Sequence, residues 1–132
     1  MKKLLAMILI FVCMTAFAAA ETDLSSMSYD ELMQLQKDVV FEIMSRPEWK
    51  QVTVPGGTWI VGKDIPAGSY SISPGEKGGY ITIKRPGEKF SIISQGIRKE
   101  SSRIGKIDLI NGDSVLIDDG SLIFAPAIGL EF

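Results

Sequence analysis

Carboxylate side chains are the first candidates for chemistry in this 132-residue sequence. Six of them lie among predicted strands and turns: Asp64, Glu76, Asp108, Asp113, Asp118 and Asp119. A glycoside hydrolase needs two carboxyl groups at a fixed separation across a cleft, and calcium needs several hard oxygen ligands. No spacing in the sequence pairs two of these acids, and three of them occupy turns, where aspartate is common. A carboxylate-based glycan hydrolase stays a second alternative, and we predict no catalytic residue and no metal site.

Other catalytic machinery is missing from the sequence. It contains no histidine, the usual general base near neutral pH and the commonest metal ligand. Its single cysteine, Cys13, falls in the apolar N-terminal segment, so the rest of the chain has no thiol for catalysis or zinc binding. The G-x-S-x-G, S-x-x-K, P-loop and G-x-G-x-x-G motifs are also absent. We therefore expect a protein that is not an enzyme and uses no cofactor.

Aromatic side chains offer a second kind of site, because the apolar face of a sugar ring stacks on an aromatic ring. Trp59 and Tyr80 are the candidate ligand-binding residues. By strand alternation Tyr80 shares its face with Thr82 and should be exposed, whereas Tyr70 shares its face with Ile72 and should point inward. The face of Trp59 is ambiguous, and a core position is the alternative for these rings. The main expectation is a non-enzymatic binding or structural module of unknown ligand, and a carbohydrate-binding module at the cell surface is the first alternative.

Charge is distributed unevenly along the chain. Residues 77–106 hold 8 basic and 2 acidic side chains, although the whole sequence has 14 basic and 16 acidic ones. Such a stretch forms an anion-binding face, or its strands interleave with acidic ones and the charges cancel in space. An acidic, exported chain is a poor nucleic-acid binder. A glycan or an anionic cell-wall polymer fits this basic stretch better.

The N-terminus has the pattern of a secretory signal peptide. Lys2 and Lys3 precede an apolar run from Leu4 to Phe17, and the small residues 18–20 form an A-x-A cleavage site. The apolar run is short for a membrane-spanning helix, and an uncleaved anchor is the alternative. We expect a signal peptide at 1–20, a secreted or extracytoplasmic location, an N-terminal segment at 21–48, and a β-sandwich domain at 49–132.

One amphipathic helix is predicted over residues 28–46. Ser28 followed by Glu31 is a capping-box start, and Pro47 ends the helix. Apolar residues recur every three or four positions and form one stripe: Leu32, Leu35, Val39, Val40 and Ile43. This stripe should pack on the rest of the domain or pair with a second copy of itself, so a homodimer through helix 28–46 is a candidate assembly.

Short β-strands follow the helix. Segments rich in Val, Ile, Thr, Tyr and Phe alternate with turns rich in Gly, Pro, Asp and Asn. The predicted strands are 50–54, 58–62, 69–73, 80–84, 90–94, 103–110, 114–118 and 121–125. The turns at 111–113 and 118–120 are typical of hairpins, and the apolar strands 114–118 and 121–125 should be central. The pattern predicts an antiparallel β-sandwich, with a jelly roll as one form of it.

The sequence GKDIPAGSY at 62–70 is predicted to be a rigid turn between two strands. Pro66 fits the second position of a β-turn and Gly68 the fourth. Ile65 precedes proline, so it should be extended and point inward. The carboxylate of Asp64 should accept the N–H of Ala67 or Gly68. We assign Asp64, Pro66 and Gly68 a structural role in the turn rather than a ligand.

The segment TWIVGKDIPAGSYSI is similar to a signature found in uncharacterised secreted bacterial proteins, in which an aromatic residue precedes V-G-x-D-I-P-A-G-x-Y-x-I. In that group an acidic GD turn and an apolar strand ending in F-x-P often follow, and this chain has NGDSVLIDDGSLIFAP. The resemblance covers residues 58–126. It implies an extracytoplasmic β-rich module of unknown function, and it carries over no catalytic or binding residues.

Overall fold

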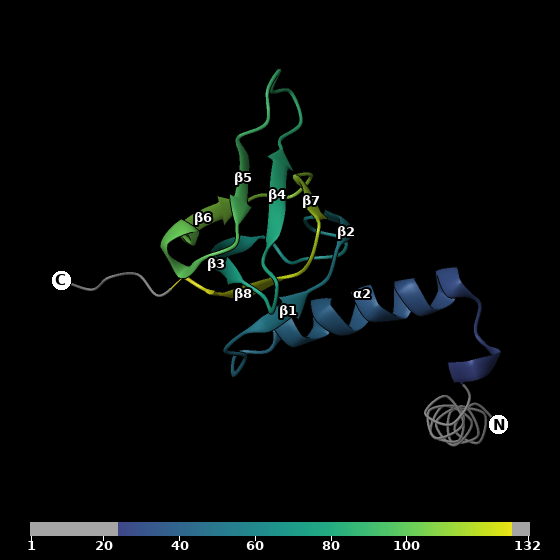
Figure 1. Cartoon of the computed structure of the whole chain (residues 1–132). Coiled ribbons are helices and arrows are strands. Elements are labelled where there is room, and N and C mark those ends of the chain that lie inside the picture. Colours follow the sequence, from purple (N-terminus) through teal and green to yellow (C-terminus); the bar gives the residue numbers. More distant parts are fainter. Residues whose placement is uncertain (1–23, 128–132) are drawn as a thin grey trace. The chain divides into compact units, whose positions relative to one another are not determined.

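The computed structural model describes residues 24–127 (Figure 1). The predicted signal peptide at 1–20 lies outside the described residues. The helices are the 3₁₀ helix η1 (Leu24–Ser26), the α-helix α2 (Tyr29–Ser45) and the 3₁₀ helix η2 (Glu100–Ser102). The strands are β1 (Val52–Val54), β2 (Gly57–Ile60), β3 (Gly68–Pro74), β4 (Gly79–Lys84), β5 (Ile93–Ile97), β6 (Ile104–Leu109), β7 (Ser114–Asp118) and β8 (Leu122–Pro126). Among these residues, no helix has the length and apolar character to cross a membrane.

The described chain divides into two compact units, residues 24–36 and residues 37–127. The first unit contains η1 and the N-terminal half of α2. Ser28 caps the helix as predicted, since its Oγ accepts the N–H of Glu31 at 3.2 Å and also donates to the Glu31 carboxylate. Asp30 and Glu31 in the first turn favour the positive end of the helix dipole. The predicted helix at 28–46 is therefore confirmed to within one residue at each end.

The second unit contains two antiparallel sheets of four strands each. Their strand orders are β1-β8-β3-β6 and β2-β7-β4-β5, which confirms the predicted antiparallel β-sandwich with one preceding helix. The central positions predicted for strands 114–118 and 121–125 are also confirmed, because β7 lies between β2 and β4 and β8 lies between β1 and β3. The largest shift is in β5, which begins three residues later than predicted.

The connections between strands differ from the prediction. Of the described strands, only β4 and β5 are both consecutive in sequence and paired in one sheet. The turns at 111–113 and 118–120 are not hairpins, since they join β6 to β7 and β7 to β8 across the two sheets. Gly112, Asp119 and Gly120 have the positive φ angles that a tight reversal needs. Residues with positive φ occur both in hairpins and in turns that connect two sheets. The turn residues alone therefore do not predict which sheet the next strand joins.

The core lies between the two sheets and includes two residues of α2. The largest fully buried side chains are Trp59 and Phe124, followed by a set of Ile, Leu and Val residues from both sheets. The strands β3, β4, β6, β7 and β8 contribute alternate hydrophobic residues, as in β4, where Ile81 and Ile83 are buried while Tyr80 is exposed. Interdigitated aliphatic and aromatic side chains of this kind supply the main driving force for folding.

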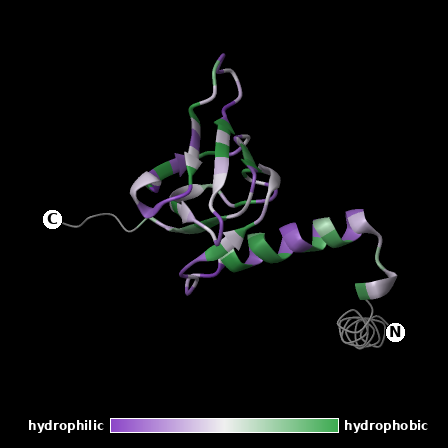
Figure 2. Ribbon diagram, viewed as in Figure 1, coloured by the Kyte–Doolittle hydropathy of each residue, from purple (hydrophilic) through white to green (hydrophobic). Residues whose placement is uncertain are grey.

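Hydrophobic residues recur along α2 (Figure 2), and the apolar stripe that they form is only partly buried. Val40 and Met44 belong to the core cluster. The other four predicted stripe residues are 37–49% exposed: Leu32, Leu35, Val39 and Ile43. Within the second unit, Val40 of the predicted stripe is therefore in the core, whereas Val39 and Ile43 stay partly exposed. Val40 and Met44, which are four residues apart, lie on one side of the helix, and the four partly exposed residues lie on a neighbouring side. A homodimer through the helix stays a prediction, which sedimentation at two protein concentrations would test.

Candidate functional site

A tight turn is present between β2 and β3, but it lies at residues 62–64 rather than at Pro66 to Gly68, and the hydrogen bonds of Asp64 differ from the expected ones. Asp64 is 2% exposed, and its Oδ2 accepts the N–H of Ile60 at 2.9 Å rather than that of Ala67 or Gly68. The N–H groups of Lys63, Asp64 and Ile65 all point to the carbonyl of Ile60. This tight loop turns the Asp64 side chain back over the end of β2. Its carboxylate therefore holds the loop closed.

Lys37 of α2 lies beside this turn. Its Nζ lies 3.6 Å from Asp64 Oδ2 and donates to the carbonyl of Thr58 at 2.9 Å. The same ammonium group lies 5.6 Å from the centre of the Trp59 ring, within the range of a cation–π contact. A buried carboxylate is costly unless a cation or hydrogen-bond donors compensate its charge. Lys37 therefore supplies the positive charge that Asp64 needs.

Pro66 and Gly68 have structural positions, but Gly68 is not there for its conformational freedom. The carbonyl of Pro66 accepts the hydroxyl of Tyr70, and Ile65 is fully buried as predicted. Gly68 starts β3 without a positive φ, and a Cβ there would meet only the Tyr70 ring, no closer than 3.6 Å. The glycine that the loop requires is Gly62, whose φ is +95°.

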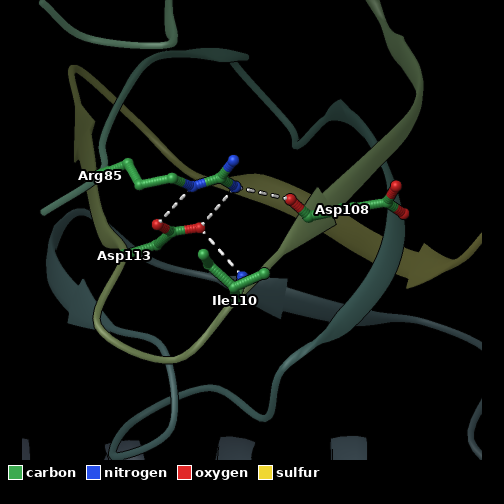
Figure 3. Close-up of polar contacts among 4 residues, drawn as sticks. All are labelled: Arg85, Asp108, Ile110 and Asp113. Carbon is green, nitrogen blue, oxygen red and sulfur yellow. Dashed lines mark hydrogen bonds and ion pairs between the residues drawn. The ribbon is translucent and has the colours of Figure 1, made fainter. Parts of the chain in front are cut away.

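A second buried carboxylate, Asp113, is fixed by Arg85 (Figure 3). Arg85 donates through Nε and Nη2 to the two carboxylate oxygens, each at 3.0 Å, and Nη2 also donates to the carbonyl of Asp108 at 3.1 Å. Asp113 Oδ2 further accepts the N–H of Ile110 at 3.0 Å. The hydrogen bonds from Arg85 lower the pKa of Asp113 below its usual value, and the carboxylate raises the pKa of Arg85. This bidentate pair joins the end of β4 to the β6–β7 turn.

The two aromatic residues predicted to bind a ligand do not share a surface. Trp59 is 1% exposed, and its Nε1 donates to the carbonyl of Pro55 at 3.1 Å, so it is a core residue. Tyr80 is 37% exposed, as expected, and its hydroxyl lies 2.9 Å from Ser94 Oγ on the neighbouring strand β5. The predicted platform of Trp59 and Tyr80 is therefore wrong, because the alternation of β2 turns Trp59 inward.

Four of the six candidate carboxylates have polar partners among the described residues. Asp64 and Asp113 are buried and already engaged by cations. Asp108 accepts the hydroxyl of Ser69, and Asp119 lies 3.8 Å from Arg98. No group of three or more His, Cys, Asp or Glu residues suited to a metal ion occurs within residues 24–127.

A pocket of about 630 Å³ lies on the sheet β1-β8-β3-β6. Its lining residues come from the segments just before β1 and β6 and from the strands β3, β6 and β8: Trp49, Lys50, Ser71, Arg103, Gly105, Ala125 and Pro126. Ser71 and Ala125 alternate with the buried residues Ile72 and Phe124. The pocket therefore opens on the face of this sheet that points away from the core.

A β-bulge shapes the pocket. Tyr70 pairs with Ile107 and Ile72 with Ile104, so the single residue Ser71 on β3 faces two residues, Gly105 and Lys106, on β6. A Cβ on Gly105 would have no heavy atom within 4 Å, so this glycine borders open space. Bulges are enriched beside binding sites because they re-aim side chains. Here the bulge places the Ser71 hydroxyl next to an unfilled part of the sheet surface.

The pocket combines three kinds of binding group. Trp49 provides an aromatic side chain, which is partly buried and packs against the edge of the core with its ring 6.0 Å from that of Tyr70. Ser71 provides a hydroxyl, and Lys50 and Arg103 provide positive charge. A largely apolar concave site with a few polar groups is the usual form of a small-ligand site.

Sequence reasoning did not identify this pocket. Trp49 and Lys50 precede the first strand, and neither belongs to a motif. The outward alternation of Ser71 was readable, but the bulge opposite it was not, because a bulge depends on how two distant strands pair. Of the basic side chains at 77–106, only Arg103 lines the pocket, since the strands of this stretch divide between the two sheets.

Comparisons with protein-family models, with curated proteins and with solved structures found no match to this chain.

Proposed function

We propose that this protein is a non-enzymatic module that acts outside the cytoplasm and binds carbohydrate in the pocket of the sheet β1-β8-β3-β6. The observation that carries the proposal is the combination of Trp49 and Ser71 in one concave site. A sugar ring has an apolar face, which stacks on an aromatic ring, and an edge of hydroxyl groups, which needs hydrogen-bond partners. The pocket offers both to one ligand.

The state of the carboxylates supports binding rather than catalysis. General acid–base catalysis of glycoside hydrolysis needs a carboxyl group that reaches the substrate and exchanges a proton near neutral pH. No carboxylate lines the pocket. The Asp113 carboxylate is buried against Arg85, which lowers its pKa away from the range that an acid catalyst requires. A bound sugar would therefore meet an aromatic ring, a hydroxyl and two cations.

The strand order supports a jelly-roll classification. The first strand pairs with the last, the second with the seventh, the third with the sixth and the fourth with the fifth. This nested pairing is what a folded-over ribbon of eight strands produces, and jelly rolls occur in lectin domains among others. That fold-level analogy supports sugar binding only weakly. The N-terminal signal-peptide pattern supports the extracytoplasmic location.

The test is a glycan array probed with the purified, exported protein, followed by calorimetry on each glycan that it retains. Gly105→Leu should fill the pocket without backbone strain, because the residue has no positive φ and borders open space. We expect Gly105→Leu to weaken binding at least tenfold and Gly105→Ala to retain most of it. An array without a single bound glycan would refute the proposal. So would a glycan whose affinity is the same for the wild type and a folded Gly105→Leu variant.

A further inference from the structure

The two cationic residues of the pocket stand at opposite edges of the sheet. Lys50 leads into β1 and Arg103 leads into β6, and these are the two edge strands in the order β1-β8-β3-β6. Neighbouring strands lie about 4.8 Å apart, so three spacings separate the backbones of β1 and β6 by about 14 Å. Ser71, Ala125 and Pro126 line the pocket between these edges. A ligand with one acidic group beside each of these edge positions would lie across the sheet.

Both cations are accessible to a ligand. Lys50 is exposed, and it forms no ion pair within residues 24–127. Arg103 donates to Glu100 at 3.1 Å, but both side chains are about half exposed or more. An exposed ion pair of this kind contributes little to stability and yields readily to a better partner. No acidic residue lines the pocket itself, so nothing in its wall repels an anion.

We propose that the ligand is an acidic oligosaccharide that lies across the sheet, with negative groups at Lys50 and at Arg103 and a sugar ring on Trp49. This inference rests on the proposed carbohydrate-binding function and narrows its ligand class. A single sugar acid carries one negative charge and has no second charged group for the other cation. An oligomer engages both and also covers Ser71. Glu100 competes with the ligand for Arg103.

Calorimetry with a length series of oligogalacturonides, from the monomer to the hexamer, tests the proposal. Carboxyl-reduced oligomers of the same lengths are the neutral controls, and sulfated dextran oligomers show whether sulfate replaces carboxylate. We expect at least tenfold tighter binding of the hexamer than of the monomer, and weaker binding as salt concentration rises, because salt screens exposed charges. Reduced oligomers should bind at least tenfold more weakly than the acidic ones.

Variants at each cation separate charge from packing. Lys50→Gln and Arg103→Gln should each weaken hexamer binding several-fold at low salt and reduce its salt dependence, while Lys50→Arg retains affinity. Glu100→Gln should strengthen binding about twofold, because it frees Arg103. Circular dichroism melts check that each variant folds, and Lys50→Arg serves as the charge-preserving comparison.

The failure of this inference differs from the failure of the proposed function. Equal affinity for reduced and acidic oligomers, together with loss of both in Gly105→Leu, would overturn the acidic ligand and keep carbohydrate binding. Equal affinity for the monomer and the hexamer would overturn the crossing geometry. Binding that is unchanged in Gly105→Leu would overturn both proposals.

Discussion

The carboxylate of Asp113 is held between the guanidinium of Arg85 and the backbone N–H of Ile110, each at 3.0 Å. It is fully buried, whereas the Arg85 side chain is 29% exposed. The pair thus presents its cation to solvent and keeps its anion inside. It ties β4 of one sheet to the turn that leaves β6 of the other sheet.

Asp113→Asn should destabilise the protein near neutral pH. The amide cannot accept both hydrogen bonds from Arg85, and the loss of a buried hydrogen-bond partner costs about 1–3 kcal/mol. Folding lowers the pKa of Asp113. The contribution of its carboxylate to the free energy of unfolding is therefore fully present above the unfolded-state pKa of about 3.9, and it is lost as the pH falls through the lower pKa of the folded state. Thermal melts from neutral to acidic pH should show the gap between wild type and variant narrowing below about pH 4. A gap that stays constant throughout would contradict this assignment.

Lys37 and Asp64 should be energetically coupled. A double-mutant cycle with Lys37→Met and Asp64→Asn isolates their interaction, because both replacements remove charge and keep most of the side-chain volume. We expect a coupling free energy of about 1 kcal/mol from denaturant unfolding, since the carboxylate is buried and the ammonium is its cation. Strictly additive effects would show that Lys37 acts through Thr58 and Trp59 alone.

Gly62 should be intolerant of a side chain, and Gly68 tolerant. Gly62→Ala places a side chain on a residue with φ of +95° and brings its Cβ within 2.8 Å of Asn111 Oδ1. The strained backbone alone costs about 1–2 kcal/mol. Gly68→Ala is the matched control, because it has neither a positive φ nor a contact closer than 3.6 Å. Melting temperatures of the two variants measure the effect. An equal decrease in melting temperature for Gly62→Ala and Gly68→Ala would contradict the requirement for glycine at position 62.

The Tyr70 hydroxyl should lose its proton at a higher pH than an ordinary tyrosine does. Burial raises its pKa to about 12, and its hydroxyl donates to the carbonyl of Pro66. The stability that it contributes is complete below the unfolded-state value of about 10 and is lost as the pH rises through 12. Near-ultraviolet absorbance during an alkaline titration should lose its latest tyrosine step in Tyr70→Phe. That variant should also be about 1 kcal/mol less stable at neutral pH, and an unchanged titration curve would contradict the burial of the hydroxyl.

The fold was largely readable from the sequence because its signals are local. Period-two alternation placed the strands, as with Tyr70 and Ile72, which are both buried. A capping serine and a proline placed the helix. The route of the chain between the sheets was not readable, since Gly112 and Asp119 give the same turn chemistry whether the next strand pairs beside the last one or crosses over.

The candidate site was less predictable for a related reason. The neighbours of Trp59 leave its face ambiguous in the sequence, and the structure buries it in the core. Trp49, which lines the pocket, belongs to no sequence motif. The pocket depends on Ser71 meeting Gly105 and Lys106, residues more than thirty positions further along the chain. No local sequence pattern predicts that pairing between β3 and β6.

The central claim is that the surface around Trp49 and Gly105 binds carbohydrate. Calorimetric titration of an acidic oligosaccharide into the wild type, Trp49→Ala, Gly105→Leu and Tyr80→Ala tests it most directly. We predict that the first two variants lose at least tenfold in affinity, and that Tyr80→Ala, altered on the other sheet, binds like the wild type. Retained affinity in folded Trp49→Ala and Gly105→Leu, or loss of affinity confined to Tyr80→Ala, would contradict the claim.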